Sequence, residues 1–245
     1  METLPFPVWT LVVLGVVGIP AMTSMAVYRG PGPRGPAARL AVVTAAVWLT
    51  WVVTSAVLAQ TGAYRQSATT TRPWLGVAAG AALAAALLGM RLPPVRRALA
   101  DPAVVARLTM PHVFRVVGVA FLVAMLLGKL PAVFALPAGL GDIAIGLAAP
   151  VVARRLARGD RRGAVWFHTL GLIDLIVAVS LGFLAGLSPS RLLDVSPSTE
   201  SIALLPLVLI PTTAVPLALA LHLVSLARLA AHRPVPSRPE PAPVR

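Results

Sequence analysis

Hydrophobic residues fill seven stretches of the chain, and each stretch is about as long as a membrane-spanning helix. A helix needs about 20 mostly apolar residues to cross the hydrocarbon core of a bilayer. The stretches cover roughly residues 7–28, 40–60, 74–92, 112–130, 133–153, 163–187 and 202–228. The pattern therefore predicts an all-α integral membrane protein. We expect a seven-transmembrane helix bundle that forms one domain over residues 1–232.

Basic residues are distributed unevenly among the loops that join these stretches. If the N-terminus lies outside, the inner loops and the tail hold most of the arginines, and the outer loops hold only Arg65, Arg72, Lys129 and Arg191. Loops rich in Lys and Arg stay on the cytoplasmic side. The sequence therefore predicts an N-out, C-in topology. Residues 233–245 are rich in proline and are predicted to be a disordered cytoplasmic tail.

The composition supports a membrane protein and limits its partners. Hydrophobic residues make up 58% of the chain and charged residues 12%, whereas a soluble domain has about 25% charged residues. The net charge of +13 lies in short basic runs between apolar stretches, which favours contact with anionic lipid headgroups rather than nucleic acid. The chain has no cysteine, so disulfides and thiolate metal sites are excluded.

Two aspartates lie inside consecutive hydrophobic stretches, in similar octamers. Asp142 is in residues 139–146 and Asp174 in residues 171–178. A charged side chain at the bilayer centre costs about 2.5–3.5 kcal/mol on insertion scales, so such residues usually have a function or a partner. Both aspartates are predicted near the midplane, on helices joined by the short loop 154–162. We expect those helices to be antiparallel neighbours, so that the two carboxyl groups approach and share a proton.

A basic side chain and two histidines are predicted on the inner side of the aspartates. Arg115 can pair with an aspartate or extend to the inner headgroups, and the sequence leaves both open. His168 and His222 lie at similar depth in the last two stretches. With Arg115 they are expected to line an inward-facing pocket below Asp142 and Asp174. These five residues are the candidate substrate or ion site.

The same residues predict neither a metal site nor another cofactor. Two histidines and two carboxylates would suffice to bind a metal, but His168 and Asp174 are six residues apart and do not share a helix face. We interpret each membrane histidine as hydrogen-bonded to a neighbouring helix. His112 lies at a boundary and is expected to be solvated. The sequence argues against retinal, because the only lysine, Lys129, lies in a predicted outer loop.

Prolines interrupt the last hydrophobic stretch and an inner loop. Pro206, Pro211 and Pro216 each remove a backbone donor and are predicted to break the helix. A broken membrane helix either provides a substrate or ion site or is a packing kink, and the sequence leaves both open. Residues 94–107 are expected to form a short helix on the inner surface, which Pro102 would interrupt.

Three motifs between Arg115 and Leu229 are similar to a known group of proteins. They read Leu-Pro-Ala-Val-Phe-Ala-Leu-Pro-Ala-Gly-Leu-Gly-Asp, Leu-Gly-Leu-Ile-Asp-Leu and Val-Pro-Leu-Ala-Leu-Ala-Leu-His-Leu. They resemble small polytopic bacterial membrane proteins, of actinobacterial type, that have no assigned function. The resemblance implies a multi-pass protein of the bacterial cytoplasmic (inner) membrane. It also implies asparagine at the position of His168 in similar sequences, which argues against a metal role for His168.

The sequence is compatible with three functions, of which the first is preferred. It is a small-molecule or proton-coupled transporter-like protein with the aspartate pair at its centre. The second is a non-catalytic membrane accessory or assembly subunit in which the aspartates are structural. The third is a membrane-embedded enzyme that acts on a lipid or isoprenoid and uses paired carboxyl groups as acid and base. The ligand is a lipid or a small molecule, and the sequence does not indicate an oligomeric state.

Overall fold

The structure, a computed structural model, describes residues 4–29, 33–67, 69, 71–186 and 192–231. These residues are largely helical and contain no strand. The proline-rich tail 233–245 lies outside the described residues. The prediction of an all-α fold is confirmed for the residues that are described.

Six helical segments are long and apolar enough to cross a membrane. They are α1 (Phe6–Tyr28), α2 (Arg34–Gln60), the segment Val104–Leu126, α7 (Ala132–Ala157), α8 (Ala164–Leu184) and the segment Ile210–Ala231. A shorter helix, α3 (Trp74–Gly89), is followed by α4 (Pro93–Leu99), and the two are bent by 77°. The described residues therefore contain six spans by length, or seven if α3 and α4 are counted as one.

Two of the spans that begin at other residues than the sequence predicted contain irregular helix. The fourth starts at Val104 rather than at residue 112, and consists of α5 (Val104–Thr109), the 3₁₀ helix η1 (Met110–Gly118) and α6 (Val119–Leu126). Part of the predicted surface helix 94–107 thus belongs to this span, and only α4 remains of it. The break at residues 100–103 contains Pro102, as predicted.

The last span begins at Ile210 rather than at residue 202. The 3₁₀ helix η2 (Thr199–Ala203) and a turn precede it, and the π-helix η3 (Ile210–Ala214) leads into α9 (Val215–Ala231). Within the turn, the backbone N–H of Val208 donates to the carbonyl of Leu204 at 2.9 Å. Irregular backbone at membrane depth is tolerated when it is buried in protein and its polar groups are paired.

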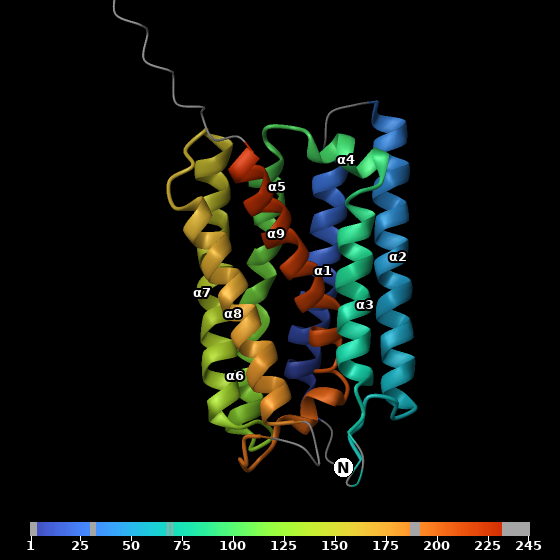
Figure 1. Cartoon of the computed structure of the whole chain (residues 1–245), viewed down its shortest axis with the longest axis vertical. Coiled ribbons are helices and arrows are strands. Elements are labelled where there is room, and N and C mark those ends of the chain that lie inside the picture. The colour runs from blue at the N-terminus through green and yellow to red at the C-terminus, as the bar shows by residue number, and fades with distance from the viewer. Residues whose placement is uncertain (1–3, 30–32, 68, 70, 187–191, 232–245) are drawn as a thin grey trace, which may run out of the picture.

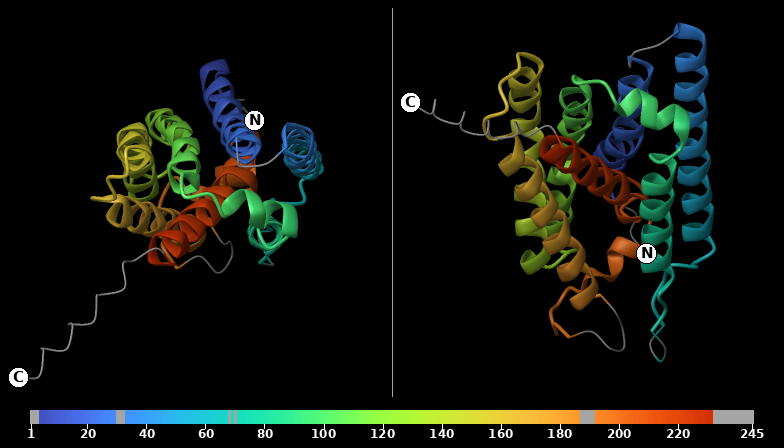
Figure 2. Two further views of the ribbon diagram at one scale, coloured as in Figure 1. Left: turned by 90° about the horizontal axis from the view of Figure 1, so that it is seen from above. Right: turned by 45° about the horizontal axis from the view of Figure 1, so that its top comes forward.

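The helices run roughly side by side, and α9 crosses the bundle obliquely (Figures 1 and 2). It contacts α8 and α5 on one side and α3 on the other. The start of α2, α4, the α7–α8 loop and the end of α9 lie at one end of the bundle, shown at the top of Figure 1. This end carries the arginine-rich segments. The start of α1 lies at the opposite end.

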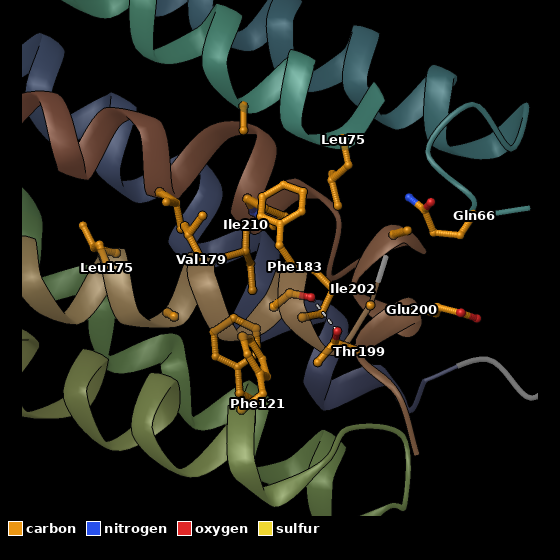
Figure 3. Close-up of a pocket in the computed structure, with 18 of the residues that line it drawn as sticks. Gln66, Leu75, Phe121, Leu175, Val179, Phe183, Thr199, Glu200, Ile202 and Ile210 are labelled. Carbon is orange, nitrogen blue, oxygen red and sulfur yellow. Dashed lines mark hydrogen bonds between the residues drawn. The ribbon is translucent and has the colours of Figure 1, made fainter. Parts of the chain in front are cut away.

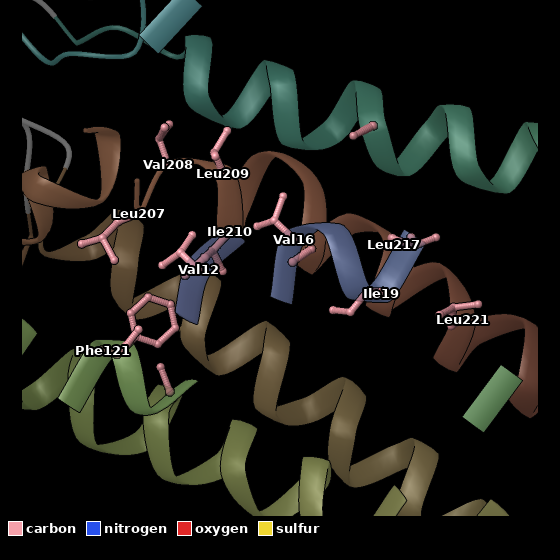
Figure 4. Packing of buried hydrophobic residues seen from close by; sticks show 14 of the residues in the cluster. Val12, Val16, Ile19, Phe121, Leu207, Val208, Leu209, Ile210, Leu217 and Leu221 are labelled. Carbon is pink, nitrogen blue, oxygen red and sulfur yellow. The ribbon is translucent and has the colours of Figure 1, made fainter. Parts of the chain in front are cut away.

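The apolar core joins α1, α6, α9 and the turn before η3 (Figure 4). Val12, Val16 and Ile19 of α1 are almost fully buried, and so are Leu207 and Leu217. In contrast, only three residues of α2 are buried, and many of its valines and leucines are exposed. A helix that is apolar all round but packed on one side only is suited to contact with lipid.

Candidate functional site

Arg115 is the centre of a buried charge cluster in the middle of the bundle. Its side chain is 3% exposed. Its Nε donates to Asp142 Oδ1 at 2.6 Å, and its Nη2 forms a hydrogen-bonded ion pair with Asp174 Oδ2. The structure therefore places Arg115 in the bundle rather than at the headgroups. The two aspartates are joined through the guanidinium, and the side chains of Asp142 and Asp174 are 15% and 16% exposed.

Glycines allow the three charged residues to meet. A Cβ atom on Gly118 would lie 2.4 Å from Cβ of Asp142, and one on Gly141 would overlap the carboxyl group of Asp174. A Cβ on Gly146 would lie 2.6 Å from the backbone nitrogen of Val116. The glycines near the aspartates thus permit a close approach of the helices.

A chain of hydrogen bonds continues from the guanidinium to two histidines. Arg115 Nη1 lies 3.1 Å from His222 Nε2, and His222 Nδ1 lies 2.9 Å from His168 Nδ1. His168 Nε2 in turn lies 3.3 Å from the hydroxyl of Thr109, which donates to the carbonyl of Val105 at 2.7 Å.

These hydrogen bonds fix the tautomers of His168 and His222 when both imidazoles are neutral. A guanidinium is only a donor, so Nε2 of His222 accepts and its Nδ1–H donates to His168. The Thr109 hydroxyl uses its hydrogen on Val105, so it accepts from Nε2–H of His168. Both ends of the chain therefore require the same assignment, in which Nδ1 of His168 is the acceptor.

A third histidine, His112, belongs to the same cluster, and its predicted solvation is wrong. It is fully buried. Its ring stacks on that of His222, with centroids 3.8 Å apart and planes inclined by 18°. Neither ring nitrogen of His112 has a hydrogen-bond partner among the described residues. The cause of the error is the starting residue of the fourth span, which is Val104 instead of residue 112 and so lies about two helical turns earlier than predicted.

The 3₁₀ conformation of η1 explains how one short segment contributes so many groups. Residues three apart eclipse one another in a 3₁₀ helix. Thr109, His112, Arg115 and Gly118 follow at this spacing, and each of them contacts the cluster. The period-three pattern of these four residues was the sequence signal that could have identified His112.

An apolar pocket leads from one end of the bundle to the charge cluster (Figure 3). Phe121, Phe183 and other apolar side chains of α3, α6, α7, α8 and η3 line it, and Asp142 is part of its wall. Gln66 and Glu200 lie at the end away from Leu175 in Figure 3. Among the described residues that line the pocket, none is basic.

Residues 72–230 match a domain of unknown function (DUF8737). The chain belongs to this family. The matched segment of the DUF8737 protein contains every residue of the cluster, from Thr109 to His222, and leaves out α1 and α2. The resemblance to a family with no assigned function is thereby confirmed. No curated protein and no solved structure is detectably similar to the chain.

The three prolines that were predicted to break the last helix lie in different structural environments. Pro206 lies in the turn before the last span, so its predicted role as a kink inside the helix is wrong. Pro211 is the second residue of the π-helix and lines the pocket. Pro216 lacks the N–H that would bond the carbonyl of Thr212, and the indole Nε1 of Trp51 donates to that carbonyl instead, at 2.7 Å.

Proposed function

We propose that this DUF8737 protein is a small transporter-like protein that exchanges a proton for an amphiphilic cation. One observation carries the proposal: Asp142 belongs both to the buried charge cluster and to the wall of the apolar pocket. A ligand in the pocket would therefore compete with Arg115 and with protons for the same carboxyl group.

The charges of the cluster suggest how the exchange would be coupled. With both aspartates ionised, Arg115 leaves one negative charge uncompensated. An uncompensated charge is costly in a low-dielectric interior, so the cluster favours one added positive charge, which is either a proton or a ligand cation. Binding of the cation at Asp142 would leave Arg115 paired with Asp174. This predicts that one proton leaves for each cation that binds.

The lining of the pocket supports a cation with an apolar body. Aromatic faces attract cations, and Phe121, Phe134 and Phe183 contribute to the wall. Asp142 supplies negative charge in the wall, and Glu200 supplies it at the exposed end. A lipophilic amine or a quaternary cation combines the positive charge and the apolar surface that such a pocket would select.

The proposed topology has seven spans, with the N-terminus outside and the C-terminus inside. In this topology α3 is a short span and α4 lies at the inner surface. The gathering of arginine-rich segments at one end of the bundle supports this orientation in a bacterial cytoplasmic membrane. Anionic headgroups are the expected partners of that end, and no nucleic acid partner is expected. The pocket would then open toward the outside, unlike the inward-facing pocket that the sequence predicted, and Arg115, His168 and His222 do not line it.

Binding of tetraphenylphosphonium to the purified protein tests the proposal. In weakly buffered detergent solution, each bound cation should release one proton. In proteoliposomes, an imposed pH gradient should drive uptake of the same probe. Asp142→Asn should abolish both, whereas Asp101→Asn, which removes an acid outside the cluster, should change neither. Wild-type protein that does not bind the probe, or binds it without proton release, would contradict the proposal.

A second function, as a non-catalytic accessory subunit, is favoured by the hydrogen bonding of Arg115. Its guanidinium contacts two carboxylates, the carbonyl of Gly171 at 3.3 Å and His222. A guanidinium that makes four hydrogen bonds with its five N–H groups can serve to hold helices together. In that case Asp142→Asn would lower thermal stability or the recovery of a bound partner protein, and proton release would be absent in the wild type.

A further inference from the structure

Three histidines from three different elements converge beside the charge cluster. His112 lies on η1, His168 on α8 and His222 on α9, and all three are fully buried. One ring nitrogen from each lies within 4.8 Å of the others. We propose that these three side chains form a binding site for a divalent transition metal, with Zn²⁺ as the first candidate. This proposal does not depend on the transport function.

His168 is already held in the tautomer that a metal ligand needs. Its Nε2–H donates to Thr109, whose own hydrogen is bonded to the carbonyl of Val105. Histidines that bind metals usually donate their second N–H to such a partner, which fixes the ring and leaves the other nitrogen free to coordinate. In His168 that other nitrogen, Nδ1, faces His222.

His112 supplies an independent observation that points to a ligand. Its imidazole is fully buried, and both of its ring nitrogens are unpaired among the described residues. A buried polar group without a partner costs about 1–3 kcal/mol. A metal ion would satisfy this group. Because no hydrogen bond holds the ring, rotation about the Cβ–Cγ bond can turn a nitrogen toward the other two histidines.

His222 must change one hydrogen bond when the metal binds. Its Nδ1 and that of His168 are 2.9 Å apart, whereas two nitrogens on a tetrahedral Zn²⁺ are about 3.3 Å apart for Zn–N bonds of about 2.0–2.1 Å. The pair therefore has to open slightly. With Nδ1 on the metal, Nε2 carries the hydrogen and can no longer accept from Arg115, which keeps its bonds to both aspartates and to Gly171.

The chemistry of the site selects the class of metal. Three neutral imidazoles without a thiolate suit Zn²⁺, Cu²⁺, Ni²⁺ or Co²⁺ rather than Mg²⁺ or Ca²⁺, which prefer oxygen ligands. Three protein ligands leave a fourth position for water or another small ligand. Only the ring of His222 separates the proposed metal from the cluster of Arg115, Asp142 and Asp174. The surplus negative charge of this cluster would offset part of the charge of the metal.

Metal titration of the full-length protein in detergent micelles tests this site. After removal of metals with a chelator, the wild type should bind one Co²⁺ or Zn²⁺ per chain, and the Co²⁺ form should show the intense visible absorption of a tetrahedral nitrogen site. His168→Asn keeps a hydrogen-bonding group near Thr109, and His112→Phe keeps the ring that stacks on His222. Both should lose this binding. His232→Asn, which changes a histidine outside the described residues, should not.

Wild-type protein that binds neither ion would overturn the proposal, and so would binding that persists unchanged in both variants. If the variants do not fold, X-ray absorption at the zinc edge of the wild type decides the question. We expect a shell of nitrogen and oxygen atoms with the scattering of three imidazoles. A shell without imidazole would exclude the site. Because neither measurement involves transport, failure here is distinguishable from failure of the proposed exchange.

Discussion

Replacing Arg115 by methionine should destabilise the protein in a way that depends on pH. The substitution keeps an unbranched side chain and removes the positive charge between Asp142 and Asp174, whose side chains are only 15% and 16% exposed. Removing one partner of a buried ion pair costs about 3–5 kcal/mol. The aspartates of the variant avoid isolated buried charge by taking up protons.

The pH dependence follows from the free energy of that protonation. An ordinary aspartate has a pKa of about 3.9, and each pH unit above it adds about 1.4 kcal/mol to the free energy of keeping the group neutral. This amounts to about 4 kcal/mol per carboxyl group at pH 7 and about 1.5 kcal/mol at pH 5. The folded variant binds more protons than the unfolded chain, so its stability decreases as the pH rises.

Thermal unfolding in detergent micelles, followed by tryptophan fluorescence at pH 5 and pH 7, measures both effects. At about 2–4 °C per kcal/mol for a chain of this size, Arg115→Met should lower the apparent midpoint by about 6–20 °C at pH 7 and by less than half of that at pH 5. Changing Asp142 and Asp174 to asparagine as well should restore most of the loss, because no buried charge is left.

A partly buried ion pair with a more exposed arginine provides the matched control. Arg107 Nη2 pairs with Asp101 Oδ2 at 2.6 Å, and the two side chains are 19% and 18% exposed. Because the side chain of Arg107 is 19% exposed and that of Arg115 only 3%, Arg107→Met should cost less than Arg115→Met, about 1 kcal/mol. Our reasoning is refuted if Arg115→Met is as stable as the wild type at pH 7, or if its loss of stability is the same at both pH values.

Two further substitutions test the close packing around the cluster. Gly171→Ala would place a Cβ atom 2.4 Å from the ring of His222 and should cost about 1–3 kcal/mol in thermal unfolding, whereas Gly80→Ala, with nothing within 4 Å of its Cβ, should be neutral or stabilising. Trp51→Phe removes the donor to the carbonyl of Thr212 and should cost about 1–3 kcal/mol, and an unchanged midpoint would show that another group satisfies that carbonyl.

The sequence was sufficient to predict the helical fold and most members of the candidate site. Apolar stretches of spanning length predict the long helices directly, because a bilayer allows few other structures. Buried charges are rare enough in such stretches that Asp142, Asp174 and Arg115 stand out by type alone. The approach of Asp142 and Asp174 could be inferred from depth and from the short loop between α7 and α8, whereas the sequence left open whether Arg115 pairs with them.

The sequence did not predict the burial of His112 or the position of Pro206, because both depend on irregular helix. The assumption of a regular α-helix starting at residue 112 placed His112 at a boundary and left its ring in solvent. In the structure, α5 begins at Val104 and η1 changes the period from 3.6 to 3, so His112 and Arg115 share one face. Likewise, Pro206 was assigned to a helix that begins only at Ile210. Apolar composition gives no sign of such changes, because every position is hydrophobic in either conformation.

The irregular segments and the polar cluster explain one another. In a regular α-helix each residue turns the chain by about 100°, so His112 and Arg115, three residues apart, would point about 60° away from each other. In a 3₁₀ helix residues three apart are eclipsed, so the two side chains lie on the same face. The hydrogen-bond geometry of a 3₁₀ helix is poorer, so runs as long as η1 are uncommon. The contacts of Thr109, Arg115 and Gly118 with α7 and α8 offset this local disadvantage. Loss of the Arg115 ion pairs should therefore also favour regular α-helix in η1, which would separate His112 from His222. The arrangement of the histidines would then depend on the charge cluster.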